Sequence, residues 1–589
     1  MKWLLIGHRA VGKTSLLWRL QKYFKENKNL MCFDLDQEIV NQEDMTITEL
    51  IQRKGEDYFR QIEIKKYKEL SGKFGDFIIS LGAGFDLSAL DPSHNCLWVR
   101  RASDLTAKIL LDRPRLDPQK NIESEYLERA KQRDVSYFLK STWIYDMPEG
   151  IQDVNEIEKN ILRQEFRIID AILTANPKIL EKLVNVNPVQ VIEIRDDLLS
   201  SQQAEGLAAS LPKNRFLFSF RNPQFNADFI PFLRSSKSMR CDYPLEFEGN
   251  QGYPKVAKEN SNIISVHHIA RDIPTTVKKL EEIGGDKFLK LALPTNSFQH
   301  LFELYKWQQQ SPKRRSYLPM SNSAKWTWFR LFMKGKQPIN FLRWGTASAT
   351  DQPTLFEWLN HPKEAKYFAA VLGRNVDLSW SPLEHNSFFK EKNIPFYRIN
   401  IEDDEFPKAL PLLAEMGLRW AAVTAPFKEK AFQFCTRTSN VASQLKAVNT
   451  LYFDDSKKLL FGDNTDIMGF RRAIEDIDIK DEVVLWGGGG TRNVIKSVIP
   501  HVVEYSARTG EPRVAIKDPL NPRILIWAGS NKSIFPPSGW HPEIVVDLNY
   551  SEDSLAKIYA YNVKAKYRSG VNMFKAQALE QRIFWSQFL

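Results

Sequence analysis

Short apolar runs alternate with amphipathic stretches along the first third of the chain. The pattern predicts strands at residues 2–6, 31–35, 77–81 and 96–100, a helix from residue 15, and a closing helix at residues 156–173. Alternation of strands and helices is typical of a parallel α/β sheet. We therefore expect a first α/β domain at residues 1–175.

The second third repeats the same alternation. Strand-like runs lie at residues 189–194, 215–220, 262–266, 288–293 and 317–320, with helical stretches between several of them. Repeated β–α units predict a (β/α)8-type barrel at residues 176–362, and it is a shortened one because full barrels usually need roughly 200 residues or more.

The last third contains two α/β parts. One begins with an apolar run at residues 366–373. The other begins at residue 482 with an apolar strand that runs into the glycine cluster 487–490, which is the pattern of a dinucleotide-binding fold. We expect a domain at residues 363–589, divided into a substrate part (363–470 with the C-terminal helix) and a nucleotide-binding part (471–565).

Composition supports a division into three domains and limits the partners. A chain of 589 residues is too long for one hydrophobic core, and its 43% hydrophobic content is ordinary for a globular protein. The net charge of +10 suits anionic ligands, but 82 basic residues stand against 72 acidic ones, so we expect small-molecule substrates rather than nucleic acid. No apolar run reaches the roughly 18 residues of a membrane span, so we expect no membrane partner.

The cysteines indicate the compartment. The four cysteines lie far apart and form no C-x-x-C pair, so neither a zinc site nor a disulfide framework is indicated. A cytoplasmic location is the default for such a chain. Composition leaves the oligomeric state open, and a homodimer is one alternative.

A glycine-rich loop follows the first strand. Gly7, Gly12, Lys13 and Thr14 complete the pattern G-x-x-x-x-G-K-[ST], and a helix begins near Ser15. In this context backbone N–H groups surround a polyphosphate, the lysine reaches its β- and γ-phosphates, and the threonine hydroxyl occupies a Mg²⁺ position. The sequence therefore predicts an ATP-binding enzyme.

Further motifs in this domain narrow the substrate. In order, they are Asp34 with Asp36, Arg60 with Glu63, Gly82-Ala83-Gly84, Arg113, and Arg133 four residues before Tyr137. Together with the loop they resemble shikimate kinase over most of the domain. One departure is Ala83, which stands where that family has the middle glycine of a triplet.

The resemblance implies a role for each matching residue. Asp34 would join Thr14 as a Mg²⁺ ligand. Lys13 and Asp36 would be the catalytic residues, and Asp36 would hold and deprotonate the reacting hydroxyl of shikimate. Arg60, Arg133 and Gly82 would bind the substrate. ATP would be bound by Gly7, Gly12, Lys13, Thr14, Ser15 and Arg113.

Polar residues end the strand-like runs of the second domain. Glu193 and Arg195 end one run, Arg221 another, His267 a third, and Lys290 lies in a fourth. The carboxyl ends of barrel strands are where such a fold carries its chemistry. Burial would lower the pKa of the lysine and make its amine nucleophilic, as an imine mechanism requires, and the histidine could move protons. A snorkelling lysine and a structural histidine are the alternatives.

These residues resemble type I 3-dehydroquinate dehydratase. The resemblance implies that Lys290 forms an imine with 3-dehydroquinate and that His267 is the general acid–base. Substrate binding would fall to Glu193, Arg195, Arg221, Arg330, Ser348 and Gln352. Phe225 stands where the family has a glutamate that orients the histidine.

The third domain carries six motifs in order, which contain Ser379 with Ser381, Thr424 with Lys428, Asn449, Asp466, Tyr550 and Gln577. Together they resemble shikimate dehydrogenase. The resemblance implies that Lys428 and Asp466 are the catalytic pair and that Ser379 and Ser381 bind the substrate carboxylate. A lysine–aspartate pair can pass the proton that accompanies hydride transfer, although a surface ion pair is the alternative. The remaining substrate contacts would be Thr424, Asn449, Tyr550 and Gln577.

NADP(H) is the implied cofactor of this domain. The pyrophosphate would be held by Gly488, Gly489, Gly490 and Thr491. The 2′-phosphate of NADP(H) would be bound by Arg508 and Thr509. In a gapless alignment Trp486 occupies the position of the first glycine in the dinucleotide-binding fingerprint G-x-G-x-x-G.

The three resemblances belong to one pathway and support one another. Their order looks like the C-terminal part of the AROM polypeptide family. We therefore expect a multifunctional enzyme that uses ATP, Mg²⁺ and NADP(H) to act on 3-dehydroquinate, 3-dehydroshikimate and shikimate. Two alternatives stay open: a ligand-sensing regulator similar to the quinate-pathway repressor, and a bifunctional kinase and dehydrogenase with an inert barrel.

Overall fold

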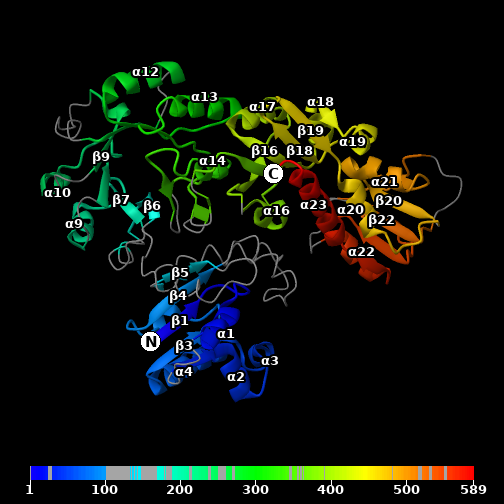
Figure 1. Cartoon of the computed structure of the whole chain (residues 1–589), viewed down its shortest axis with the longest axis horizontal. Coiled ribbons are helices and arrows are strands. Elements are labelled where there is room, and N and C mark those ends of the chain that lie inside the picture. The colour runs from blue at the N-terminus through cyan, green and yellow to red at the C-terminus, as the bar shows by residue number, and fades with distance from the viewer. Residues whose placement is uncertain are drawn as a thin grey trace. The chain divides into compact units, whose positions relative to one another are not determined.

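The computed structural model defines two compact units, one holding most of residues 1–364 and the other most of residues 365–589 (Figure 1). The structure describes residues 2–23, 30–100, 133, 136–137, 140–141, 143–146, 169–177, 180, 183, 189–210, 215–235, 240–249, 261–267, 272–343, 348–353, 357–358, 361–362, 364–377, 379–390, 392–480, 482–514, 521–529, 534–549 and 554–589.

The first sheet has five parallel strands in the order β2-β3-β1-β4-β5. Its strands are β1 (Lys2–Ile6), β2 (Leu30–Asp34), β3 (Asp76–Ser80), β4 (Asn95–Arg100) and β5 (Trp143–Asp146). The central strand β1 is apolar and buried from Trp3 to Ile6, as expected of a parallel strand covered on both faces. The four strands predicted here are confirmed to within one residue at each end.

The glycine-rich loop connects strand β1 to helix α1. The helix residues Leu16, Leu17 and Leu20 are buried against β1, β3 and β4 in one core cluster. Because α1 starts directly after the loop, this packing fixes the loop at the carboxyl end of β1. The helices of this part are α1 (Lys13–Tyr23), α2 (Leu35–Glu43), α3 (Ile47–Lys54) and α4 (Glu56–Lys73), with a 3₁₀ turn at Leu87–Ala89.

The second sheet has eight parallel strands in the order β12-β11-β10-β9-β8-β7-β6-β13. Neighbours in this order are also neighbours in the chain, except that the last strand β13 pairs with the first strand β6. The strands are β6 (Ile169–Thr174), β7 (Val189–Arg195), β8 (Phe216–Ser219), β9 (Arg240–Pro244), β10 (Ile263–Val266), β11 (Phe288–Leu291), β12 (Arg315–Tyr317) and β13 (Phe341–Leu342).

Side chains connect β12 to the segment that leads into β13. The Tyr317 N–H donates to Oε1 of Gln337 at 3.0 Å, and the Ile339 N–H donates to Oγ of Ser316 at 3.0 Å. These polar side chains therefore satisfy backbone donors at the two ends of the strand order. The helices are α9 (Ser201–Ser210), α10 (Ile230–Ser235), α12 (Ile273–Gly284), α13 (Phe298–Gln309) and α14 (Thr327–Phe332), with 3₁₀ turns at Ala227–Phe229 and Leu245–Phe247.

Strand β6 lies where the sequence predicted the end of a closing helix. The prediction of a helix at residues 156–173 is wrong over residues 169–173, which form β6, while residues 156–168 lie outside the described residues. Pairing with β7 and β13 makes a strand of this segment, so β6 belongs to the second sheet although it precedes residue 176. The strands β9 and β13 were not predicted, and β12 lies two residues earlier than expected.

The second unit contains a six-stranded mixed sheet in the order β15-β14-β16-β18-β19-β17, in which β18 is antiparallel to both of its neighbours. Its strands are β14 (Phe368–Gly373), β15 (Phe396–Asn400), β16 (Leu418–Val423), β17 (Arg437–Thr438), β18 (Thr450–Asp454) and β19 (Leu459–Asp463). Its helices are α16 (Ser381–Lys390), α17 (Phe406–Met416), α18 (Lys428–Phe434), α19 (Asn440–Leu445) and α20 (Asp466–Ala473).

The other sheet of this unit has five parallel strands in the order β21-β20-β22-β23-β24. They are β20 (Val483–Gly487), β21 (Val503–Tyr505), β22 (Ile524–Ala528), β23 (Ile544–Asp547) and β24 (Lys566–Arg568), with α21 (Arg492–Val498), α22 (Leu555–Asn562), α23 (Val571–Ser586) and a 3₁₀ turn at Gly489–Thr491. The strand order reverses between β20 and its neighbours, which is the arrangement of a doubly wound α/β fold.

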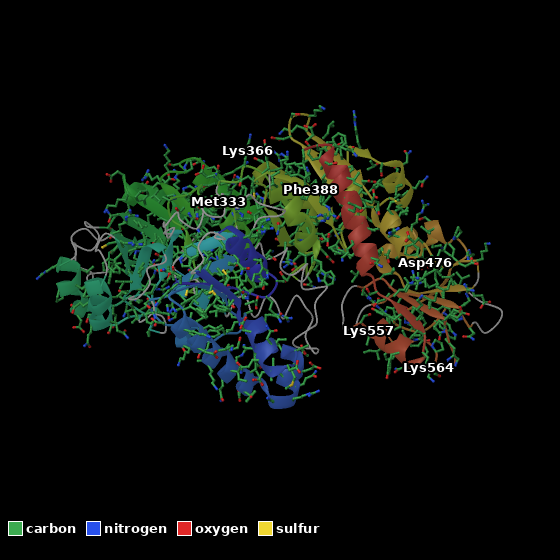
Figure 2. All side chains as sticks on the ribbon, turned by 60° about the horizontal axis from the view of Figure 1, so that its bottom comes forward. Met333, Lys366, Phe388, Asp476, Lys557 and Lys564 are labelled. Atoms are coloured by element: carbon green, nitrogen blue, oxygen red, sulfur yellow. The ribbon has the colours of Figure 1, made fainter. Side chains whose placement is uncertain are left out.

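Helix α23 lies alongside α20 where the two parts of this unit meet (Figure 1). A Cβ on Gly469 would lie only 2.8 Å from the backbone oxygen of Met573, so a glycine allows the close approach. The guanidinium of Arg568 at the end of β24 binds the carboxylate of Asp476, with Nη2 2.5 Å from Oδ2. Figure 2 labels Asp476 on this part of the chain.

The helices that the structure describes do not include a membrane span. None of them combines the length and apolarity that crossing a bilayer requires.

Candidate active sites

The glycine-rich loop between β1 and α1 has the backbone of a phosphate cradle. Gly7 and Gly12 have φ angles of 145° and 97°, which favour glycine, and a Cβ on Gly7 would overlap the backbone oxygen of Val99. The Lys13 amine folds over the loop and donates to the backbone oxygens of Gly7 and His8, at 2.8 Å each. Ser15 follows in the first turn of α1 and is exposed.

The charges around Lys13 come from the predicted carboxylates. Burial lowers the pKa of Lys13 to about 8, and Asp36 and Asp34 oppose this shift. Burial also raises the pKa of Asp36, as does Asp34, whereas Lys13 and Arg60 oppose that rise. The structure thus brings the loop lysine and both carboxylates into one electrostatic cluster.

Thr14 and Asp34 form a direct contact. Oγ1 of Thr14 donates to Oδ2 of Asp34 at 2.6 Å, and the Gln37 N–H donates to the other carboxylate oxygen at 3.4 Å. A hydroxyl beside a carboxylate is the oxygen donor set that Mg²⁺ uses in phosphoryl-transfer sites. The residues predicted as metal ligands therefore fit the ion.

Arg60 is held by two carboxylates of its own helix. Its guanidinium lies 2.5 Å from Oε2 of Glu63 and 2.8 Å from Oε1 of Glu56. Gly84 faces this guanidinium and Gly82 faces Glu63 and Asp36, so a Cβ at either glycine would overlap these groups. Burial raises the pKa of Glu63 to about 7, while Arg60 opposes the rise.

The backbone carbonyl of Ala83 connects the Gly82-Ala83-Gly84 turn to Arg133 and Tyr137. Nη1 of Arg133 and Oη of Tyr137 both donate to the backbone oxygen of Ala83, at 3.0 and 2.5 Å. Because these contacts use the backbone, the methyl group of Ala83 does not prevent them. Arg113, the remaining predicted residue, lies outside the described residues.

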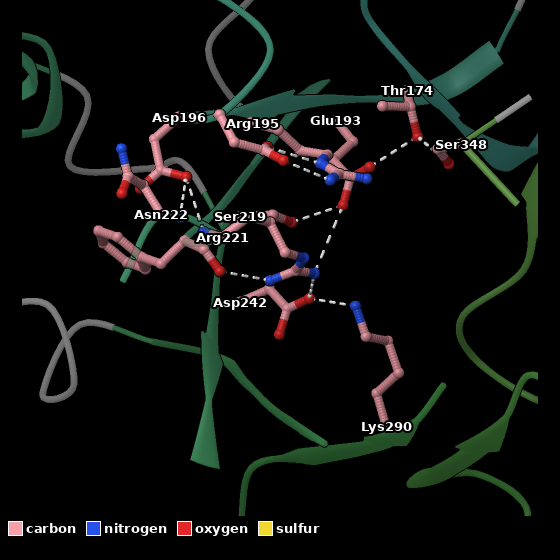
Figure 3. Close-up of polar contacts among 12 residues, drawn as sticks. Thr174, Glu193, Arg195, Asp196, Ser219, Arg221, Asn222, Asp242, Lys290 and Ser348 are labelled. Carbon is pink, nitrogen blue, oxygen red and sulfur yellow. Dashed lines mark hydrogen bonds and ion pairs between the residues drawn. The ribbon is translucent and has the colours of Figure 1, made fainter. Parts of the chain in front are cut away.

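A polar cluster lies at the carboxyl ends of neighbouring strands of the eight-stranded sheet (Figure 3). Oδ2 of the buried Asp242 binds both the Lys290 amine and Nη2 of Arg221, the latter at 2.6 Å. Glu193 accepts from the hydroxyls of Thr174 and Ser219, at 2.6 Å each. The structure therefore brings Glu193, Arg221 and Lys290 together, as predicted.

Asp242 is a residue that sequence reasoning missed. Burial alone would raise its pKa, but Lys290 and Arg221 outweigh that effect and hold its pKa far below the usual range. It lies on β9, a strand that was not predicted, and a lone aspartate followed by Tyr-Pro gives no signal of its own.

His267 belongs electrostatically to this cluster. Burial, Arg221 and Lys290 hold the pKa of His267 well below its usual value, so its imidazole is neutral. Its backbone N–H donates to Oε1 of Glu246 at 2.5 Å. Burial likewise lowers the pKa of Lys290, although Asp242 opposes the shift.

The other residues predicted for this domain have different partners. Arg195 binds Asp197 with both ends of its guanidinium, at 2.9 and 2.6 Å. Arg330 donates twice to the backbone oxygen of Pro319, and burial lowers its pKa to about 10. The structure therefore ties these two arginines to the protein itself.

Ser348 and Gln352 bind each other and meet the cluster through Thr174. Nε2 of Gln352 donates to Oγ of Ser348 at 2.8 Å, and that hydroxyl lies 3.5 Å from Oγ1 of Thr174 (Figure 3). Phe225, at the position of the family's glutamate, has its ring 6.1 Å from that of Phe220. An aromatic contact therefore occupies this position.

Lys428 and Asp466 form an ion pair in the second unit. Nζ of Lys428 lies 2.5 Å from Oδ2 of Asp466, and their side chains are 15% and 2% exposed. The other carboxylate oxygen accepts from Nδ2 of Asn449 at 2.8 Å. Lys428 begins α18 and Asp466 begins α20, so two helix starts converge on the loop that carries Asn449.

The two predicted serines lie at the start of α16. Oγ of Ser379 is 3.2 Å from Oγ of Ser381 and accepts the Ser381 N–H at 3.3 Å. Arg398 donates to the Ser379 carbonyl from Nε and Nη2, at 3.0 and 2.7 Å, a contact that no motif indicated. Paired hydroxyls of this kind suit a carboxylate.

Thr424 and Gln577 are placed by backbone packing. The Thr424 N–H donates to the Leu372 carbonyl at 2.9 Å, and Gln577 lies on α23 next to Gly469 of α20. Tyr550 lies outside the described residues.

The glycine cluster after β20 begins at Gly487. Gly487 and Gly488 have φ angles of 97° and 119°, and a Cβ on Gly487 would lie 2.9 Å from the backbone oxygen of Ala528. Trp486 is instead a strand residue with its buried indole donating to the Ile534 carbonyl at 2.9 Å. The placement of Trp486 at the first glycine position is therefore wrong, because the tight turn starts one residue later.

This turn lies where doubly wound sheets bind ligands. The crevice outside the carboxyl ends of the strands, at the point where strand order reverses, is the usual ligand position. Gly489 also has a positive φ of 36°, and a Cβ on Gly490 would meet nothing within 4 Å. Thr491 closes the turn by donating its hydroxyl to the Gly488 carbonyl at 2.8 Å. A backbone without side chains at this point fits a pyrophosphate.

Arg508 and Thr509 follow the neighbouring strand β21. Their N–H groups donate to Oγ of Ser506 at 3.4 and 3.3 Å, which shapes the turn and leaves Arg508 exposed. The turn follows the carboxyl end of β21, next to β20 in the sheet.

Comparison with known proteins relates two segments to known families. Residues 9–162 match the family model described as shikimate kinase, and residues 371–451 match the model of the shikimate dehydrogenase substrate binding domain. Lys428 and Asn449 lie within the second match. One chain thus combines regions similar to a kinase and to a dehydrogenase.

Curated relatives support the second match. The chain is 34% identical over 136 residues to the shikimate dehydrogenase (NADP(+)) of Prochlorococcus marinus (strain MIT 9215), covering 22% of the chain and 47% of that protein. It is 32% identical over 134 residues to the corresponding enzyme of Clostridium botulinum (strain Hall), covering 22% and 51%. The chain therefore spans about half the length of the curated relatives that it matches.

Solved structures of the same name are also similar. Shikimate dehydrogenase from Aquifex aeolicus is 20% identical and covers 38% of the chain and 93% of its own, with a TM-score of 0.33. Shikimate 5-dehydrogenase from Thermus thermophilus, in complex with NADP(H) and shikimate, is 24% identical and covers 38% and 94%, with a TM-score of 0.34.

Proposed function

We propose that the chain is a multifunctional enzyme of the shikimate pathway, with an NADP-dependent shikimate dehydrogenase, a shikimate kinase and a type I 3-dehydroquinate dehydratase. The observation that carries the proposal is the Lys428–Asp466 pair, which Asn449 holds. Lys428 and Asn449 lie within the region similar to the dehydrogenase substrate domain.

The dehydrogenase would work through proton transfer by this pair. Ser379 and Ser381 would bind the substrate carboxylate and so place the reacting hydroxyl at Lys428 and Asp466. NADP(H) would supply the hydride when bound at Gly487–Gly490. The lysine amine would take up or release the proton of the hydroxyl, while the aspartate keeps the amine in position.

The kinase would rely on positioning and charge, as phosphoryl transfer generally does. Lys13 would neutralise the phosphates of ATP, and Thr14 with Asp34 would hold Mg²⁺. Asp36 would orient the attacking hydroxyl, since its carboxylate lies in the same electrostatic cluster. The guanidinium groups of Arg60 and Arg133 would bind the shikimate carboxylate.

The eight-stranded sheet would be a (β/α)8-type barrel with imine chemistry. Its strand order, with β13 paired to β6, supports this proposal. The neutral Lys290 amine would add to the carbonyl carbon of 3-dehydroquinate, and loss of the carbonyl oxygen as water would leave an imine, which a water molecule would hydrolyse after the elimination to release 3-dehydroshikimate and the free amine. His267, which is neutral, would then remove the proton next to the imine and return it to the departing hydroxyl.

The sheets support revised domain boundaries. The kinase would end before Ile169, the barrel would run to about residue 364, and the dehydrogenase would occupy residues 365–589. The four cysteines are free thiols, which suits a cytoplasmic enzyme with small-molecule substrates.

One reconstitution tests the three activities. The purified full chain receives 3-dehydroquinate with NADPH, then ATP with Mg²⁺, and each product is identified by mass. We expect 3-dehydroshikimate, shikimate and shikimate phosphate in turn. Lys290→Met, Lys428→Met and Lys13→Met should each stop one step and leave the other two, and failure of the dehydrogenase step in the wild type would contradict the central proposal.

A bifunctional enzyme with an inert barrel is the second candidate. It is favoured by Phe225, which packs on Phe220 where the dehydratase family has a glutamate, and by the ion pair that holds Lys290. Turnover of 3-dehydroshikimate but not of 3-dehydroquinate would support it. Tight ligand binding without any turnover would instead support a sensor.

A further inference from the structure

We propose that Gln581 is a positioning residue that connects helix α16, at the serine end of the dehydrogenase site, to the Lys428–Asp466 pair. The connection runs through His385 and Asn449. This inference rests on the proposed dehydrogenase function and assigns roles to Gln581 and His385, which none of the predicted roles include.

A chain of buried hydrogen bonds carries the inference. Oε1 of Gln581 lies 3.0 Å from Nε2 of His385, and Nε2 of Gln581 donates to the backbone oxygen of Asn449 at 3.0 Å. An amide oxygen only accepts, so Nε2 of His385 carries the donated proton. The three residues are at most 5% exposed, so these bonds form away from water.

The Asn449 end of the chain reaches the proposed catalytic carboxylate. The Asn449 oxygen also accepts the Val423 N–H at 2.8 Å, which fixes this part of the backbone from two sides. From that backbone Nδ2 of Asn449 reaches Oδ1 of Asp466 at 2.8 Å and Oγ1 of Thr465 at 3.0 Å. Gln581 therefore acts on the carboxylate through the residue that holds it.

The His385 end reaches the paired serines. His385 lies four residues after Ser381 on α16, and its ring packs on Trp585 and Phe396 with centroids 4.9 and 5.1 Å away. Residues four apart lie on the same face of a helix. A shift of α16 that moved Ser381 would therefore also move His385 and strain its bond to Gln581.

Helix α23 brings a third site element to the same place. Gln577, which the resemblance assigns to the substrate, precedes Gln581 by one helical turn on the same face. The amide of Gln581 is thus joined to α16, to the Asn449 loop and, along its own helix, to Gln577. Buried polar groups are costly unless they are satisfied, and here both ends of the amide are satisfied by elements that carry site residues.

The experiment uses three variants of the full chain. Gln581→Met keeps the size of the side chain but removes both hydrogen bonds. Gln581→Glu keeps the acceptor for His385 and loses the donor to Asn449 whenever the new carboxyl is ionised. Leu579→Ala on the exposed face of α23 is the control, since Leu579 is 50% exposed.

For Gln581→Met we expect kcat for shikimate oxidation to fall by about tenfold to a hundredfold, because small misplacements of catalytic groups cost this much. The KM for NADP⁺ should stay within about twofold, since the nucleotide turn is untouched, as expected of a positioning effect. Leu579→Ala should match the wild type, and thermal unfolding of each sample reports whether the second unit is folded.

For Gln581→Glu we expect a pH profile that the wild type lacks. The protonated acid can still donate to Asn449, so kcat should be nearest to wild type at low pH and fall as the new carboxyl ionises. The titratable and charged groups in this chain of contacts are His385, the Lys428–Asp466 pair, and the Arg582–Glu384 pair at 3.3 Å. They are present in both proteins, so the ratio of the two profiles isolates the substituted residue.

The outcomes separate this inference from the function on which it rests. An active wild type with an unaffected Gln581→Met overturns the inference alone. So does a parallel loss of kcat, NADP⁺ affinity and thermal stability with an unchanged pH ratio for Gln581→Glu, because that pattern is only structural. A wild type with kinase activity but no dehydrogenase activity overturns the proposed function and the inference together.

Discussion

Two lysine–aspartate pairs of this chain have nearly the same contact and very different surroundings. The Lys290–Asp242 pair is 3% and 0% exposed, and the same carboxylate oxygen also binds Arg221. The Lys428–Asp466 pair is 15% and 2% exposed, and its carboxylate has a neutral amide, that of Asn449, as its other partner. One pair is enclosed by further charges, whereas the other opens toward solvent on the lysine side.

The difference teaches what each lysine can do. Enclosure lowers the pKa of Lys290, which favours a neutral amine that can attack a carbonyl. Lys428 keeps a path to solvent and a single charged partner, which suits an amine that exchanges a proton with a bound hydroxyl. Under the proposed function, the same two residue types would support covalent chemistry in one place and proton transfer in the other.

Replacing each lysine by methionine should give the largest effects. We expect Lys428→Met to slow shikimate oxidation by about 10²–10⁴-fold, the usual contribution of a general acid–base. Lys290→Met should stop dehydration of 3-dehydroquinate. Borohydride added with 3-dehydroquinate should leave an adduct by mass spectrometry on the wild type and on Lys428→Met only. An adduct on Lys290→Met would break the comparison.

Removing each aspartate should separate the pairs by stability. Asp242→Ala leaves Arg221 and Lys290 buried without their carboxylate, so we expect a loss of about 3–5 kcal/mol. Asp466→Ala should cost about 1–2 kcal/mol, because the Lys428 amine can turn to water. Urea unfolding followed by fluorescence of both variants measures the difference, and equal losses would mean that the two environments are alike.

The loop lysine of the kinase part adds a third environment. Its pKa is lowered to about 8 by burial. It is charged below that pH and attracts phosphate, so ADP affinity should fall as pH rises through about 8, by up to about tenfold per pH unit. Titration calorimetry between pH 7 and 9 measures this. Glu63→Gln is the control, since Glu63 also titrates near pH 7, and its slope should equal that of the wild type.

Arg508 is exposed, whereas Lys290 is buried, so replacing Arg508 should have the smallest effect of these substitutions. An exposed charge contributes about 0.2–1 kcal/mol, so Arg508→Gln should reduce the preference for NADP⁺ over NAD⁺ by about twofold to fivefold. The ratio of kcat/KM for the two cofactors measures the change. Lys557→Gln on helix α22 is a matched surface control, and a loss of preference as large as a hundredfold would mean that Arg508 is not simply exposed.

Local patterns predicted the parts of this molecule that depend on local geometry. The glycine-rich loop could be found because Gly7 and Gly12 need a positive φ and because an apolar strand precedes them. The pairing of Lys428 with Asp466, which are far apart in sequence, followed only from the resemblance to a family. No rule of spacing would have joined those two residues.

Long-range pairing explains what was missed. Residues 169–173 resembled a helix end, but pairing with β7 and β13 makes them a strand. Asp242 was invisible because its importance comes from Arg221 and Lys290 on other strands. His385 lay inside a quoted motif, yet its link to Gln581 crosses nearly the whole dehydrogenase part.

The glycine at position 469 has a mechanical consequence. The chain leaves the six-stranded sheet through α20 and returns from the five-stranded sheet through α23. These two helices meet at Gly469, which faces the backbone oxygen of Met573 and Cβ of Gln577. Asp466 is the first residue of α20 and lies one helical turn before Gly469, whereas Lys428 begins α18 of the same half. A side chain larger than hydrogen at position 469 would push α20 away from α23, and the carboxylate of Asp466 at the start of α20 would shift relative to the Lys428 amine.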